Sequence, residues 1–145
     1  MLRTYDPKDV RIVVGGFPIG GFADGTFLNL EMDEDSFSKE TGADGETARA
    51  KSNNNGGSAT LTLMQTSPSN DVLSGFAQAD RLSNAGVVPL LIQDGSGRTT
   101  LFSATAWVRK RPAASFSKEI EEREWVLDLA DVDYFVGGNP ETEPA

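Results

Sequence analysis

The clearest pattern in the chain lies between Gly56 and Gly86, where alternating apolar and polar side chains give way to apolar side chains at helical spacing. In Ala59–Thr66, Leu61 and Leu63 fall on one face and threonines on the other, which predicts a half-buried strand. The apolar residues that then recur at helical spacing are Val72, Phe76, Ala79 and Leu82. The stretch therefore predicts one strand followed by one helix.

Both ends of this helix carry signals in the sequence. Ser67 is placed to act as the N-cap, where its hydroxyl accepts a hydrogen bond from an otherwise unpaired N–H. Pro68 suits the first helical position, because a missing N–H costs nothing there. Gly86 is suited to the left-handed conformation that commonly ends a helix. We expect a helix spanning about residues 68–84.

The remainder of the chain predicts strands joined by glycine-containing turns. The predicted strands are Val10–Phe17, Thr26–Met32, Val87–Gln93, Thr99–Lys110 and Phe116–Ala130. The turn signals are GGFPIGG at residues 15–21, Asp24-Gly25 and Asp94-Gly95-Ser96-Gly97. In one of these strands a single face is expected to carry Phe102, Ala104, Ala106 and Val108. The chain should therefore be mainly β with one helix.

The stretch Phe116–Ala130 is ambiguous. Its first part, SKEIEER at residues 117–123, has a helix-forming composition, whereas Trp125, Leu127 and Leu129 alternate with less apolar residues as in a strand. We favour one bent or bulged strand, because the preceding strand needs an antiparallel partner. A short helix at 117–123 is the alternative.

The segment Lys39–Ser58 contains almost no large apolar residue, so it cannot bury a face of its own. Glycine, asparagine and serine in this segment predict a surface loop. A loop of roughly twenty residues is long for a compact domain, and loops of that length are usually functional or disordered. We expect one domain over residues 1–136, with this loop as an extension and 137–145 as a flexible tail.

Composition argues against an enzyme. The chain has 145 residues, enough for one core, and contains neither cysteine nor histidine. The usual general base, thiol nucleophile and commonest metal ligands are therefore missing, and no Gly-x-Ser-x-Gly motif is present. We expect no catalytic residues, no cofactor and no metal. Apolar runs are too short to span a bilayer and the N-terminus lacks a signal-peptide core, which predicts synthesis in the cytoplasm and no membrane partner.

The chain is acidic, with 13 basic and 22 acidic side chains and a net charge of −9, which disfavours binding to nucleic-acid phosphates. One acidic cluster comprises Glu31, Asp33, Glu34 and Asp35. It lacks the glycine of a calcium-binding loop, so a solvated strand end is the better interpretation. The single basic cluster, Arg109-Lys110-Arg111, has no interleaved aromatic residue and fits a turn or the partner of an acidic cluster.

Four local sequences stand out: LTLMQTSPSNDVL at Leu61–Leu73, TGADGETARAK at Thr41–Lys51, VPLLIQDG at Val88–Gly95 and REWVLDL at Arg123–Leu129. Together with the order of elements, they resemble the tail tube proteins of contractile-tailed bacteriophages. The resemblance extends from about residue 10 to residue 136. It implies an antiparallel β-sandwich or barrel-like subunit with one helix, located in the virion tail.

The resemblance also implies how such a subunit works. Copies would close into hexameric rings, and the rings would stack into a tube through which DNA is ejected without specific binding. Tail sheath, baseplate and tail terminator would be further partners. The long loop would contact a neighbouring subunit or ring through Gly42, Asp44, Glu46, Arg49, Lys51 and Asn54. We expect it to order only on assembly. Candidate residues facing the lumen are Glu119, Glu121, Glu122 and Glu124.

A monomeric β-sandwich binding module, for carbohydrate or another partner, is the alternative function. Such a module needs aromatic side chains on an exposed face. Only Trp107 and Trp125 could serve as tryptophan platforms, and both lie within strand patterns where a core position is expected.

Overall fold

The computed structural model describes residues 2–141. Its helices are a short 3-10 turn, η1 (Pro7–Asp9), and α1 (Ser69–Ser83). Its strands are β1 (Val10–Val14), β2 (Phe17–Pro18), β3 (Leu28–Met32), β4 (Phe37–Thr41), β5 (Thr47–Lys51), β6 (Gly57–Met64), β7 (Val88–Asp94), β8 (Thr100–Lys110), β9 (Glu122–Leu129) and β10 (Asp133–Phe135). The expectation of a mainly β chain with one α-helix is confirmed.

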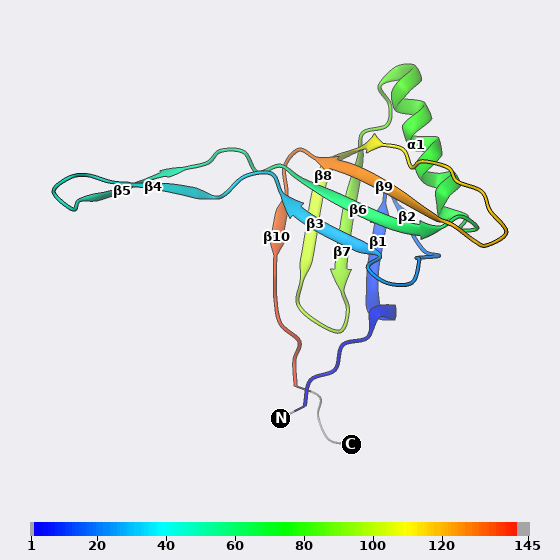
Figure 1. The fold of residues 1–145 in the computed structure, drawn as a ribbon, viewed down its shortest axis with the longest axis horizontal. Helices are drawn as coiled ribbons and strands as arrows, with labels where there is room; N and C mark the ends of the chain where they lie inside the picture. Colours follow the sequence, from blue (N-terminus) through cyan, green and yellow to red (C-terminus); the bar gives the residue numbers. More distant parts are fainter. Residues whose placement is uncertain (1, 142–145) are drawn as a thin grey trace.

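Eight of these strands form one antiparallel sheet that folds over on itself. The order along it is β2-β1-β7-β8-β9-β6-β3, and β10 pairs with β8 outside this path. The first half of β8 pairs with β7 and β10, whereas its second half pairs with β9. Figure 1 shows that β3, β6 and β9 cross obliquely over β1, β7 and β8. The result is a barrel-like sandwich.

The core lies between the two halves of this folded sheet. Alternate side chains of β6 are buried, as the period-2 pattern predicted, and the core cluster combines residues from both halves. Its largest fully buried apolar side chains are Ile12, Val14, Leu61, Leu63, Leu73, Leu90, Leu101 and Leu127. Each such leucine or isoleucine contributes roughly 2 kcal/mol of burial free energy. The two halves are therefore held together mainly by apolar packing.

A polar junction fixes the start of α1 against the sandwich. The Ser67 hydroxyl donates to the carbonyl of Gly20 at 2.6 Å and accepts from the N–H of Ser69 at 3.2 Å. The Ser69 hydroxyl in turn accepts from the N–H of Gly20 at 3.0 Å. The next residue, Asn70, accepts through its side-chain oxygen from the indole N–H of Trp125 at 2.9 Å. These bonds satisfy buried polar groups and set the direction of the helix.

The limits of α1 differ slightly from those predicted. Pro68 rather than Ser67 occupies the cap position, although the Ser67 hydroxyl still accepts a hydrogen bond from the first turn. The helix ends at Asn84, which adopts the left-handed conformation with φ of 56°, so Gly86 is not its stop. Leu82 is 73% exposed, and its assignment to the buried face is wrong. The helix packs instead through Val72, Leu73, Phe76 and Ala77.

A bulge in β8 changes which of its side chains share a face. Val88 pairs with Ala106, but Leu90 pairs with Ser103, so the register shifts by one residue between them. A one-residue shift moves side chains to the opposite face of a strand. Ala106 is therefore buried whereas Phe102 is exposed. The expectation that Phe102, Ala104, Ala106 and Val108 share one face is wrong.

The glycine turns and the chain ends complete the fold. Gly15 and Gly16, both at positive φ, join β1 to β2, as the GGFPIGG sequence predicted. The segment 137–141 lies beside the N-terminal arm, since the Asn139 amide donates to the carbonyl of Thr4 at 2.9 Å. Of the expected flexible tail, residues 142–145 lie outside the described residues. No helix within residues 2–141 has the length and apolar character needed to cross a membrane.

Candidate assembly surfaces

The segment predicted to be a long loop is a β-hairpin. β4 and β5 pair antiparallel from Phe37 opposite Lys51 to Thr41 opposite Thr47. Every residue of both strands is exposed, and Figure 1 shows the hairpin projecting far from the body of the molecule. A loop lacking regular structure was therefore the wrong prediction. A two-stranded hairpin without tertiary cover is only marginally stable in water, so we retain ordering on assembly as a proposal.

Short polar contacts shape the tip and the base of this hairpin. At the tip, the N–H of Gly42 donates to the carbonyl of Glu46 at 2.8 Å, and the carboxylate of Asp44 accepts from the N–H of Glu46 at 3.2 Å. At the base, the Ser52 hydroxyl donates to Glu34 at 2.8 Å, and the side-chain oxygen of Asn54 accepts from the N–H of Gly56. The base is thereby fixed to the end of the sandwich.

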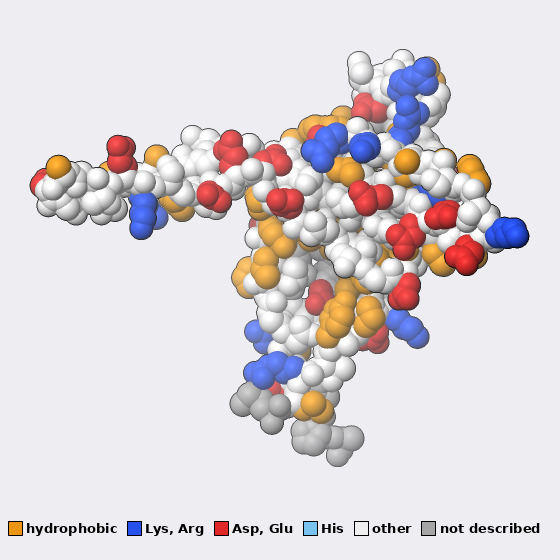
Figure 2. Space-filling model, in the orientation of Figure 1, with side chains coloured by type: hydrophobic (Ala, Val, Ile, Leu, Met, Phe, Trp, Pro, Cys, Tyr) orange, Lys and Arg blue, Asp and Glu red, His pale blue; other side chains and the backbone are white. Residues whose placement is uncertain are grey.

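The two faces of the hairpin differ in charge. Directly paired residues lie on the same face, and successive residues alternate between faces. One face carries Phe37, Lys39, Thr41, Thr47, Arg49 and Lys51. The opposite face carries Ser38, Glu40, Ala48 and Ala50. The Arg49 guanidinium lies 4.3 Å from the ring centre of Phe37 on the first face, which we call the basic face. Figure 2 shows basic side chains projecting from one side of the hairpin.

At the opposite end of the body lies an irregular segment, residues 111–121, which we call the end loop. Figure 1 places it and the hairpin at opposite ends of the longest axis. The prediction of a strand paired with the preceding strand is confirmed for Glu122–Leu129. Within the end loop, neither the first part of that strand nor the alternative helix at 117–123 forms. Phe116 is 79% exposed and Ile120 is 63% exposed.

Arg123 holds the end loop in place. This side chain is only 8% exposed, and its guanidinium donates to the carbonyls of Glu122 at 3.0 Å and Ser115 at 3.1 Å. It also lies 5.1 Å from the ring centre of Phe116. The backbone of Gln65 and its side chain both bond to the backbone of Glu121. Sequence reasoning missed Arg123, although its alternation with Trp125 and Leu127 already placed it on the buried face.

Replacing Arg123 with alanine should therefore release the end loop. We expect the free energy of unfolding to fall by about 1–3 kcal/mol, because carbonyls lose their donors and the aliphatic stem loses its packing. Trypsin should cut after Lys118 roughly ten times faster than in the unaltered chain, because cleavage follows local opening. Arg81→Ala, at an exposed arginine of α1, is the control and should change neither quantity. Equal cleavage rates in Arg123→Ala and the unaltered chain would refute the anchoring role.

The four glutamates expected at the lumen separate into two pairs. Glu122 and Glu124 lie on β9 and are exposed, on the face opposite to the buried Trp125. Glu119 and Glu121 lie in the end loop instead, so the expectation that all four line one strand is wrong. The Ser117 hydroxyl donates to the Glu121 carboxylate at 2.8 Å. Figure 2 shows acidic side chains gathered over this end of the molecule.

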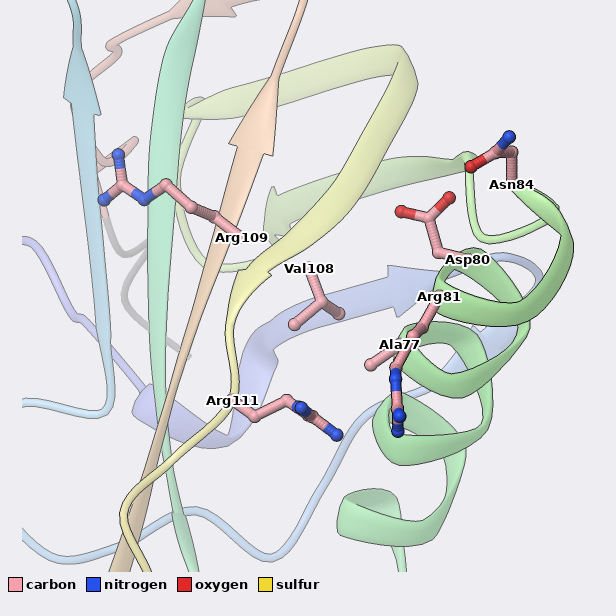
Figure 3. Close-up of a pocket in the computed structure, with 7 residues that line it drawn as sticks. All are labelled: Ala77, Asp80, Arg81, Asn84, Val108, Arg109 and Arg111. Atoms are coloured by element: carbon pink, nitrogen blue, oxygen red, sulfur yellow. The ribbon is translucent and has the colours of Figure 1, made fainter.

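The basic cluster at the end of β8 is divided by the structure. Arg109 forms an ion pair with Asp128 at 3.1 Å. Figure 3 shows Arg111 and Arg81 pointing into the same gap between the end of β8 and α1, while Arg109 points away. The open cavity there has a volume of about 280 Å³. Sequence reasoning missed Arg81, because nothing in the linear pattern brings α1 beside residue 111.

The described residues form no candidate metal site. No three acidic side chains within residues 2–141 come together to bind a metal ion, and Glu34 of the acidic cluster accepts a hydrogen bond from Ser52. Trp125 is buried at 2% exposure, as its strand pattern predicted, and is hydrogen-bonded to Asn70. The surfaces with the most distinctive geometry are thus the hairpin, the end loop and the gap into which Arg81 and Arg111 point.

Comparisons with known proteins agree with this description. The family model described as bacteriophage PhiTE tail tube protein matches residues 9–137. A structural protein, ORF10 of Pseudomonas phage KPP10, is 35% identical over 150 residues, covering 98% of this chain and 87% of the relative. The tube-terminating cap of the anti-feeding prophage has a similar fold, with a TM-score of 0.63, 13% identity and 93% of each chain covered. A chain of the sheath-tube complex of an extracellular contractile injection system gives a TM-score of 0.62, with 16% identity and 91% of each chain covered.

Fold and sequence together define a structural subunit of a phage tail, which is not an enzyme. The chain belongs to the bacteriophage PhiTE tail tube protein family.

Proposed function

We propose that copies of this protein close into hexameric rings, and that the rings stack into the hollow tube through which phage DNA is ejected. The observation that carries the proposal is the hairpin β4–β5, whose strands are wholly exposed and make no contribution to the core of their own subunit. A projecting element of this kind gains stability only by packing on another molecule. Family membership supports a tube as that assembly.

Open strand edges support the same proposal. β3 pairs only with β6 within the described residues, so its other edge presents unpaired backbone groups. Such an edge invites pairing with another chain, and a closed ring of identical subunits satisfies it without uncontrolled growth. The inter-subunit contacts of the hairpin would involve Arg49 and Lys51 on its basic face, with Gly42, Asp44 and Glu46 near its tip.

The acidic surface fits a conduit for DNA. A net charge of −9 disfavours the phosphate contacts that would slow the passage of DNA. We retain Glu122 and Glu124, on the exposed face of β9, as the candidates that face the lumen. Tail sheath, baseplate and terminator are the proposed partners, and the structural relatives in sheath-tube and tube-cap assemblies support the first and the last of these.

Electron microscopy with negative stain, over a series of protein concentrations, tests the proposal directly. Rings or hollow tubes of uniform width, with light scattering that gives a matching mass, would establish assembly. A monodisperse monomer at every concentration, even with baseplate seeds, would refute it and favour a binding module.

A further inference from the structure

We infer that the end loop of one subunit is the docking site for the basic face of the hairpin of the next subunit in the ring. This inference rests on the proposed ring assembly and names the contact that closes it. The hairpin and the end loop project from opposite ends of the longest axis of the molecule, so adjacent copies can meet end to end (Figure 1).

The basic face of the hairpin is suited to an anionic partner. Lys39 lies directly opposite Arg49, and like charges at paired positions destabilise a β-ladder. Lys51 adds a third cation to the same face. None of these three side chains forms an ion pair within residues 2–141, so their mutual repulsion is not offset inside the subunit. An acidic surface on a second copy would offset it.

The end loop offers the complementary chemistry. Glu119 and Glu121 supply carboxylates, and Glu122 follows them directly. The basic side chains of the loop are Lys118 and Arg111, and Arg111 points into the gap beside α1 (Figure 3). Neither Glu119 nor Glu121 forms an ion pair among the described residues. Phe116 and Ile120 on the same loop expose large apolar surfaces, which another molecule could cover. Phe37 and the aliphatic stems of the cationic side chains give the basic face the apolar area to do so.

Symmetry selects the end loop over the other acidic patch. The cluster at Glu31–Asp35 immediately precedes the hairpin, and Ser52 ties Glu34 to the hairpin base. Because hairpin and cluster lie at the same end, mutual contact between the hairpin of each copy and this cluster of the other would join like ends and close a two-fold dimer. Contact with the end loop joins unlike ends, and a repeated head-to-tail contact generates a ring.

Charge reversal on each side, followed by mixing, tests the inference. We expect Lys39→Glu with Arg49→Glu, and separately Glu119→Lys with Glu121→Lys, each to raise the critical concentration for assembly at least about tenfold. An equimolar mixture should assemble near the concentration of the unaltered chain, because alternating copies restore opposite charges at every contact. Ser38→Glu, which adds negative charge to the other face of the hairpin opposite the uncharged Ala50, should leave the critical concentration within about twofold.

The outcomes separate this inference from the proposed function. Unaltered chains that never assemble refute the ring itself. The docking contact is refuted, but not the ring, if the unaltered chain assembles and either reversed variant assembles at the same concentration. A mixture of the two reversed variants that remains monomeric would refute the docking contact in the same way.

A carbodiimide, which couples neighbouring amines and carboxylates, provides an independent measurement on tubes of the unaltered chain. Half of the subunits carry heavy nitrogen, so that mass spectrometry distinguishes links between copies. Links from Lys39 or Lys51 to Glu119 or Glu121 of another copy support the contact. Links from these lysines only to residues 31–35, or none at all, overturn it.

Discussion

Gly86→Ala is expected to destabilise the subunit by roughly 3 kcal/mol, which for a domain of this size lowers the midpoint of thermal unfolding by about 10 °C. Gly86 is buried where the chain leaves α1 and turns back toward β7. A Cβ atom at this position would overlap the carbonyl oxygen of Phe76 and the Cβ of Asp80. Both belong to the helix, so neither can yield as the end of a flexible side chain would.

Gly75→Ala is the matched control for this prediction. Gly75 lies within α1, is exposed, and has open space around the position of an added Cβ. Alanine should therefore stabilise the helix by about 0.5–1 kcal/mol. Chemical denaturation of both variants gives the two changes in the free energy of unfolding. Similar values for the two variants would show that the close approach at Gly86 does not constrain the fold.

The contrast between Gly86 and Asn84 shows why helix ends are hard to place from sequence. Glycine after a polar run is the commonest signal for a left-handed stop, yet Asn84 adopts that conformation here. Gly86 is needed for a different reason, the close approach of two backbone segments. Only the packing of the chain after α1 against the helix distinguishes these roles, and no local pattern encodes it.

The strands of the body follow from sequence because one of their faces is buried. Alternation at β6 reflects a periodic burial that the amino-acid pattern must match. The hairpin β4–β5 buries neither face, so its apolar content is low and the period-2 signal is carried by charged residues such as Lys39 and Arg49. An absence of apolar residues therefore indicated exposure correctly, but it did not indicate disorder.

The candidate site residues were predictable to a similar extent. Exposure of Glu122 and Glu124 follows from their alternation with Trp125, which the sequence shows. The departure of Glu119 and Glu121 from that strand depends on contacts from Gln65 and Arg123 to the end loop. The contact from Gln65 joins segments that are distant in the chain, and the contact from Arg123 depends on one buried charge. Neither kind of contact produces a periodic pattern in the sequence.

Excision of the hairpin should abolish assembly while leaving the fold intact. The N–H of Ser52 donates to the carbonyl of Ser36 at 2.9 Å, so the two ends of the hairpin already meet. Replacing Phe37–Lys51 with two glycines can therefore close the chain without moving β3 or β6. Because the hairpin buries nothing and a shorter loop loses less entropy on folding, the free energy of unfolding should stay within about 1 kcal/mol of its original value.

Sedimentation velocity and electron microscopy of this variant measure assembly, and chemical denaturation measures the fold. A second variant keeps the length of the hairpin but replaces its strands with glycine and serine, which separates the effect of length from that of the side chains. Both variants should remain monomeric where the unaltered chain forms rings, because each lacks the basic-face side chains of the hairpin that projects from one end of the longest axis (Figure 1). The excised chain could instead form rings at the same critical concentration as the unaltered chain. That result would mean that the sandwich body alone closes the ring, through edges such as that of β3. The hairpin would then act only in contacts between rings.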